Sequence, residues 1–70
     1  MHMTQAEFDV EQVAGYMERR PGQRISYHTI AADLKIPVTR CGAALSYLLK
    51  HGTCPGLARV GRGVYQLDPP

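Results

Sequence analysis

Prolines and glycines divide this chain of 70 residues into short segments, and this division limits the folds that it can adopt. Pro21-Gly22 ends the first long segment, Pro37 separates the second from the third, and Gly52 closes the third. A Pro55-Gly56 turn and the run Gly61-Arg62-Gly63 follow. Because the residue before a proline is pushed out of the helical region and glycine readily ends a helix, we expect three short helices followed by two short strands.

The first helix has two competing start signals. Thr4-Gln5-Ala6-Glu7 has the S/T-x-x-E form of a capping box, and Asp9-Val10-Glu11-Gln12 offers a second cap. Phe8 could pack on Val13 as a hydrophobic staple, which favours the second start. We therefore expect the main helix to begin after Asp9 and residues 4 to 8 to form a turn or an extension. The expected buried stripe of this helix consists of Val10, Val13, Ala14 and Met17.

Two further helices are expected close together. Ser26 is placed to cap a helix over residues 27 to 35, and a connection of three or four residues leads to a helix over residues 38 to 50, opened by Pro37. Helices joined so tightly have the form of a helix-turn-helix. Before them, residues 24 to 26 supply at most one extended residue pair. The expected buried positions are Ile30, Ala31, Leu34, Cys41, Leu45, Leu48 and Leu49.

In the C-terminal part, the spacing of hydrophobic residues changes from that of a helix to that of a strand. The runs LARV (57 to 60) and VYQL (64 to 67) are β-prone, and the glycine-rich loop between them is typical of a hairpin. The chain is therefore expected to form one α+β domain over residues 9 to 67, with residues 1 to 8 as an N-terminal extension and residues 68 to 70 as a tail.

Charge is unevenly distributed along the chain. Residues 1 to 18 carry four acidic residues and no Lys or Arg, whereas residues 19 to 67 carry eight basic residues against Asp33 alone, a charge of +7. The net charge of +2 hides this asymmetry. It favours a surface that faces a polyanion, with an acidic back, although ordinary solvated faces remain the alternative.

Several classes of function find no support in the sequence. The histidines at 2, 28 and 51 and the cysteines at 41 and 54 lack the spacing of a metal site or disulfide framework. No carboxylate pair, nucleophile elbow or phosphate-binding glycine loop is present. No apolar run approaches the ~18 residues of a membrane helix. We therefore expect no enzyme activity, metal, cofactor, small-molecule substrate or membrane association, and a cytoplasmic protein with reduced cysteines.

Two stretches together resemble the winged helix-turn-helix DNA-binding domains. ISYHTIAADLKIPVTRCGAALSYLLKHG is similar to the second and third helices of that family, and ARVGRGVYQL is similar to a short wing with an arginine at its tip. The resemblance covers about residues 9 to 67 and implies three helices with a C-terminal two-stranded β-hairpin wing. It also implies sequence-preferring binding of double-stranded DNA, as a small transcriptional regulator or nucleoid-associated factor, with helix 38–50 in the major groove and wing 57–67 on the adjacent minor groove or backbone.

The outward side chains of the third helix are then the candidates for DNA contacts. Arg40 can take a guanine bidentately, and Thr39 or Ala43 can meet a thymine methyl group. Arg40 could instead be merely solvated, although its charge is slightly unfavourable at a helix start. Tyr47 could belong to the edge of the core. The full set on this helix is Thr39, Arg40, Ala43, Ser46, Tyr47 and Lys50.

A second group of candidates lies outside this helix. Arg62, flanked by two glycines, can reach a minor groove or a phosphate, unless Gly-Arg-Gly is only a turn. Arg24 and Arg59 would neutralise phosphates. The start of the second helix can hold a phosphate, although Ser26 could serve only as a cap. The residues at that start are Ser26, Tyr27 and His28.

The alternative function is a protein-interaction module of the same fold. The acidic N-terminal helix could present Phe8 and Tyr16 beside its glutamates to a protein partner. The same helix, or residues 1 to 8, could mediate a homodimer, since a single copy covering one half-site would bind DNA weakly.

Overall fold

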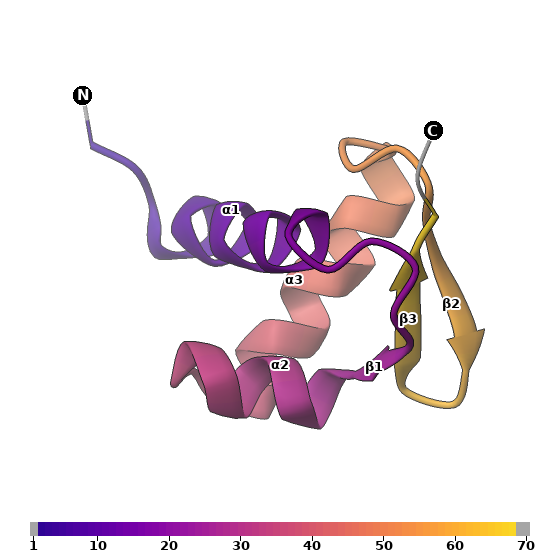
Figure 1. Cartoon of the computed structure of the whole chain (residues 1–70). Coiled ribbons are helices and arrows are strands. Elements are labelled where there is room, and N and C mark those ends of the chain that lie inside the picture. The colour runs from indigo at the N-terminus through magenta and orange to yellow at the C-terminus, as the bar shows by residue number, and fades with distance from the viewer. Residues whose placement is uncertain (1, 69–70) are drawn as a thin grey trace.

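The computed structural model describes residues 2–68, and its elements follow the predicted order of helix, short strand, helix, helix and hairpin (Figure 1). The three helices pack together, and the strands form an antiparallel sheet beside them with the order β1-β3-β2. The α+β class is confirmed, and the layout is consistent with a winged helix. Met1 of the expected extension and Pro69-Pro70 of the expected tail lie outside the described residues. The elements are α1 (Gln5–Glu18), β1 (Ile25–Ser26), α2 (Tyr27–Leu34), α3 (Val38–His51), β2 (Leu57–Gly61) and β3 (Val64–Leu67).

Helix α1 begins at the first of its two start signals. The Thr4 hydroxyl accepts a hydrogen bond from the Glu7 backbone N–H at 3.1 Å, and the Thr4 N–H donates to the Glu7 carboxylate at 3.0 Å. The expected start after Asp9 is wrong, because this complete capping box fixes the helix one turn earlier. Phe8 remains 46% exposed. Residues 5 to 8 therefore belong to the helix and not to an extension.

The helix-turn-helix forms as predicted. Ser26 caps α2 by accepting a hydrogen bond from the Thr29 N–H at 3.2 Å. Lys35 ends α2 in the left-handed conformation, with φ 58°, and Pro37 takes the N-cap position of α3, one residue before the expected first turn. Gly52 closes α3 with φ 62°, as predicted for a residue just past a helix end.

The core lies where the three helices meet the sheet. Most of the predicted core positions are buried, and Val10, Ala14 and Leu34 are partly buried against them. Leu49 is 38% exposed, which contradicts the prediction, because the inner stripe of α3 consists of Cys41, Ala44, Leu45 and Leu48 and Leu49 falls beyond its edge. The fully buried side chains of largest volume are Met17, Ile30, Leu45, Leu48, Val13 and Cys41.

Strand β1 makes the sheet larger than the predicted two-stranded hairpin. β2 and β3 pair from Leu57↔Leu67 to Gly61↔Val64, and β1 adds the pairs Ile25↔Tyr65 and Ser26↔Val64 on the other side of β3. The predicted extended residue pair is thus a third strand. Because β1 runs directly into α2, this pairing ties the wing, residues 57–67, to the start of α2.

None of the helices described between residues 2 and 68 has the length and apolar character that crossing a membrane requires.

Candidate nucleic-acid interface

A groove of about 580 Å³ lies between the start of α2, the outer side of α3 and the wing. Six of the residues that the sequence singled out line it, and none of its lining residues is acidic. We call it the basic groove. The N-terminal end of the acidic helix α1 lies at the opposite end of the molecule from the wing (Figure 1). The lining residues are Ser26, Tyr27, His28, Gly42, Ser46, Arg59, Arg62, Gly63 and Tyr65.

Tyr27 connects the three elements that form the basic groove. Its backbone N–H donates to the carbonyl oxygen of Gly63 in the wing at 2.9 Å. A Cβ atom at Gly63 would lie only 2.9 Å from the Tyr27 ring, and one at Gly42 of α3 would lie 4.0 Å from the same ring. The rings of Tyr27 and His28 are 4.2 Å apart between centroids. The half-buried Tyr27 ring therefore sets the spacing between α3 and the wing.

The basic side chains around this groove are exposed. Arg62 stands at the wing tip, and the Nε–H of Arg59 donates to the Gly61 carbonyl at 3.2 Å, which aligns its guanidinium along the wing. Lys50 lies in the last turn of α3, and Arg24 directly precedes β1. Exposed cations around a groove whose lining contains no acidic residue give this side of the molecule a positive potential.

The predicted outward face of α3 divides into two parts. Thr39, Ala43, Ser46 and Lys50 are exposed and follow helical spacing along the side away from the core. Arg40, Ala43 and Tyr47 border a separate hollow of about 330 Å³ against α1. From the sequence these side chains form one face, because periodicity within α3 does not show where a neighbouring helix covers it.

Arg40 is held by Asp9 of α1. Its Nε and Nη2 donate to the two carboxylate oxygens of Asp9, each at 2.8 Å, and Gln5 donates to the same carboxylate at 3.1 Å. The Asp9 side chain is 5% exposed and the Arg40 side chain 40%. The hydrogen bonds from Arg40 lower the pKa of Asp9 although burial acts in the opposite direction. The Nε–Nη2 edge of the Arg40 guanidinium is therefore occupied, while Nη1 has no hydrogen-bond partner among the residues that the structure describes.

The sequence contains a signal for the pair of Asp9 and Arg40 that the predicted contacts did not include. Asp9 lies one helical turn before Val13, on the stripe that faces the core. A carboxylate buried at such a position needs a cation or hydrogen-bond donors. Arg40, with a charge poorly placed for its own helix start, was a suitable partner.

Tyr47 is not part of the core. It is 47% exposed, and its ring lies 4.2 Å from the ring of His51 between centroids. Tyr47 faces α1 and not the basic groove, so any contact it makes with DNA would be at the flank of α3.

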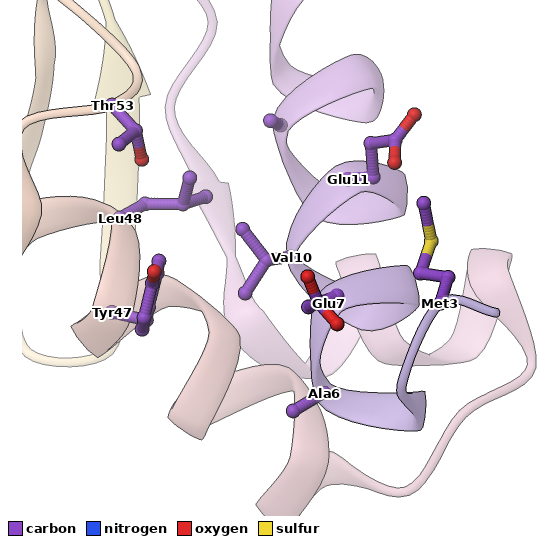
Figure 2. A pocket seen from close by; sticks show the side chains of 9 residues that line it. Met3, Ala6, Glu7, Val10, Glu11, Tyr47, Leu48 and Thr53 are labelled. Atoms are coloured by element: carbon purple, nitrogen blue, oxygen red, sulfur yellow. The ribbon is translucent and has the colours of Figure 1, made fainter. Parts of the chain in front are cut away.

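A second groove, of about 370 Å³, lies between α1 and the C-terminal half of α3 (Figure 2). Val10 of α1 points toward Leu48 and Tyr47 of α3, and α1 carries Glu7 and Glu11 along the same groove. We call it the acidic groove. Tyr16, expected on this surface, is instead 3% exposed in the core. The remaining lining residues are Met3, Ala6, Ala14 and Thr53.

Comparison of the chain with protein-family models, curated proteins and solved structures found no match. In the part of the chain that the structure describes, no three His, Cys, Asp or Glu side chains are grouped so that they could hold a metal ion. The interpretation of function therefore rests on the two grooves and their charges.

Proposed function

We propose that this protein binds double-stranded DNA with sequence preference, as a small transcriptional regulator or nucleoid-associated factor of the cytoplasm. α3 occupies the major groove and the wing contacts the adjacent minor groove or backbone. The observation that carries this proposal is the basic groove, which combines Gly42 and Ser46 of α3, the start of α2 and two wing arginines without an acidic lining residue.

The exposed side of α3 has the dimensions and chemistry for a major groove. That groove is about 12 Å wide and admits one α-helix, whose N-terminal residues meet the base edges. Thr39 and Ala43 are in the first turns of α3, Ser46 follows, and Lys50 in the last turn supplies a cation for a phosphate contact. These side chains are small except for Lys50, so the helix can approach the bases closely.

The surrounding residues supply contacts to the DNA backbone. Arg24, Arg59 and Arg62 neutralise phosphates, and the start of α2 adds the positive end of a helix dipole. Arg40 acts as a positioning residue, since its ion pair with Asp9 holds the first turn of α3 against α1. Tyr47 is left to contact sugar or phosphate at the flank.

Salt-dependent binding tests this proposal. Fluorescence anisotropy of a labelled mixed-sequence duplex at about 50 and about 200 mM salt should show affinity that falls steeply with salt. Arg62→Ala should weaken binding and reduce the salt slope by about one unit. Arg19→Ala removes the same charge at the end of α1, outside the basic groove, and should change affinity much less. Absence of duplex binding at the lower salt would refute the proposal.

The acidic groove favours a second candidate function, which is binding of a protein partner. Glu7, Glu11 and Glu18 follow one stripe of α1, and the first two border the apolar floor of this groove. The occupant that matches this chemistry is an amphipathic helix with apolar residues on one face and Lys or Arg along one edge. Two copies of this protein meeting symmetrically here would bring their acidic stripes together, which disfavours a homodimer through this surface.

A labelled peptide tests this second function. The probe has leucines at positions i, i+3, i+4 and i+7 with lysines beside them, and the control peptide has glutamates in place of the lysines. Ala6→Lys should abolish binding of the lysine peptide, because Ala6 lines the groove. Gln12→Lys adds the same charge at an exposed position of α1 outside the groove and should retain binding. Equal effects of the two variants, or self-association in sedimentation instead of peptide binding, would reject this function.

A further inference from the structure

In the first turns of α3, the only side chain able to form a bidentate bond to a purine is that of Arg40, and one edge of its guanidinium is already bound. Guanine is read mainly by Arg or Lys and adenine by Asn or Gln. α3 contains no Asn or Gln, and the Nε–Nη2 edge of Arg40 is bound to Asp9, which holds the guanidinium against α1. Lys50 is in the last turn, away from the N-terminal residues that meet base edges.

What α3 does offer at these positions is methyl groups. Thr39 and Ala43 are exposed and one turn apart, and each ends in a methyl group on the side away from the core. In the major groove the matching feature is the C5-methyl group of thymine, which no other DNA base carries. The two methyl groups therefore suit A·T pairs, whereas the strong donor for G·C pairs in these turns, Arg40, is tied to α1 through Asp9.

The wing tip has an independent preference for the same base pairs. Arg62 is exposed between Gly61 and Gly63, so no neighbouring side chain obstructs its entry into a minor groove. A·T-rich tracts have a narrow minor groove whose negative potential attracts arginine, and they lack the guanine amino group that projects into it. Because Tyr27 fixes the wing relative to α3, both contacts would fall on one site.

We propose that the preferred ligand of the basic groove and the adjoining first turns of α3 is A·T-rich duplex DNA, read through thymine methyl groups by Thr39 and Ala43 and through the minor groove by Arg62. This inference rests on the proposed function, because it names the class of DNA that the same surface binds. It assigns the two grooves of the DNA to two different elements of the protein, so each assignment can be tested separately.

Four duplexes of equal length separate the two contacts. The first is A·T-rich and the second G·C-rich. The third contains deoxyuridine for thymidine, which removes only the major-groove methyl groups. The fourth contains inosine paired with cytosine, which presents the minor groove of A·T and the hydrogen-bonding major groove of G·C. Binding of the full chain to each is measured by anisotropy at about 100 mM salt.

The expected order is A·T first and G·C last, with the other two between them. Loss of the thymine methyl groups should weaken binding about fourfold for each methyl contacted. Thr39→Ser keeps the hydroxyl and removes the methyl, so it should reduce the preference for thymine over uracil. Arg62→Ala should remove the preference for inosine over guanine and leave the preference for thymine in place.

The outcomes distinguish this inference from the function on which it rests. Equal affinity for the A·T and G·C duplexes would overturn the inference and leave DNA binding intact. Equal affinity for the thymine and uracil duplexes would overturn the methyl contacts proposed for α3. Equal affinity for the inosine and guanine duplexes would overturn the minor-groove contact proposed for Arg62. No binding to any duplex at about 50 mM salt would reject the proposed function itself.

Discussion

Arg40 and Asp9, 31 residues apart in the sequence, join α3 to α1 through two hydrogen bonds of 2.8 Å. The pair lies between the first half of α1 and the first turn of α3, the turn that we propose enters the major groove. The ion pair therefore contributes to the orientation of α3, and Asp9 is the one buried residue with a charged side chain described between residues 2 and 68.

Asp9→Asn should lower stability in a pH-dependent way. Its hydrogen bonds with Arg40 hold the pKa of Asp9 below the usual value of 3.8 in the folded state. The ionised carboxylate therefore stabilises the fold above about pH 4, and this stabilisation is lost as the pH falls through the lowered pKa. Urea unfolding should show a lower midpoint for the variant at pH 7 and a smaller difference between the two proteins near pH 3.

Glu11→Gln provides the control for this measurement, because Glu11 is exposed on the same helix. It should change the midpoint little at either pH. A deficit of Asp9→Asn that stays constant between pH 7 and pH 3 would mean that the charge of Asp9 does not contribute to stability, and that the effect comes from packing alone.

Local patterns in the sequence were enough to predict most of the fold. The cap at Ser26, the end of α3 at Gly52 and the hairpin depend on neighbours within a few residues, and each is found where it was expected. The predicted start of α1 after Asp9 is wrong because the local capping box of Thr4 and Glu7 begins the helix earlier, and Asp9 pairs with the distant Arg40 instead of acting as a cap.

Only part of the candidate site could be predicted, because contacts between distant parts of the chain decide which side chains meet. Ser26, Tyr27, His28 and the wing arginines meet in one groove because the pairing of β1 with β3 brings the wing to α2, a contact that hairpin signals alone do not contain. Arg40 and Tyr47 were grouped with the groove-facing residues because helical periodicity identifies a face and not its neighbours. The position of α1 decides which of these side chains are free.

Tyr16→Phe should destabilise the protein by about 1 kcal/mol. The buried Tyr16 hydroxyl donates a hydrogen bond to the Asp33 carboxylate of α2, and the Arg20 guanidinium lies 3.7 Å from the centre of the Tyr16 ring. Phenylalanine keeps the ring packing and removes only the hydrogen bond. If this bond links α1 to α2, the double variant Tyr16→Phe with Asp33→Ala should lose little more free energy of unfolding in urea than either single variant. A loss equal to the sum of the two single losses would contradict the link.

Both cysteines should resist alkylation in the folded protein. Cys41 and Cys54 are free and buried, and burial raises the pKa of the Cys41 thiol to about 11 and raises that of Cys54 as well. Because the thiolate is the reactive form, iodoacetamide at pH 8 should modify neither residue until the chain is unfolded in urea. Mass spectrometry with and without urea measures this, and rapid modification of the folded protein would contradict the burial of both thiols.

Gly63→Ala should impair both stability and the arrangement of the wing. Gly63 has φ 68°, and an added Cβ would lie 2.9 Å from the Tyr27 ring, so the substitution adds a steric clash to backbone strain. Gly22→Ala is the matched control, because Gly22 has φ 79° with nothing within 4 Å of the added atom. We expect a loss of about 1 to 2 kcal/mol for the control and a larger loss for Gly63→Ala in urea unfolding. If the Tyr27 contact spaces α3 and the wing, Gly63→Ala should also weaken duplex binding under conditions where both variants are folded. Equal losses of unfolding free energy for Gly63→Ala and Gly22→Ala would show that the clash with Tyr27 is relieved without effect.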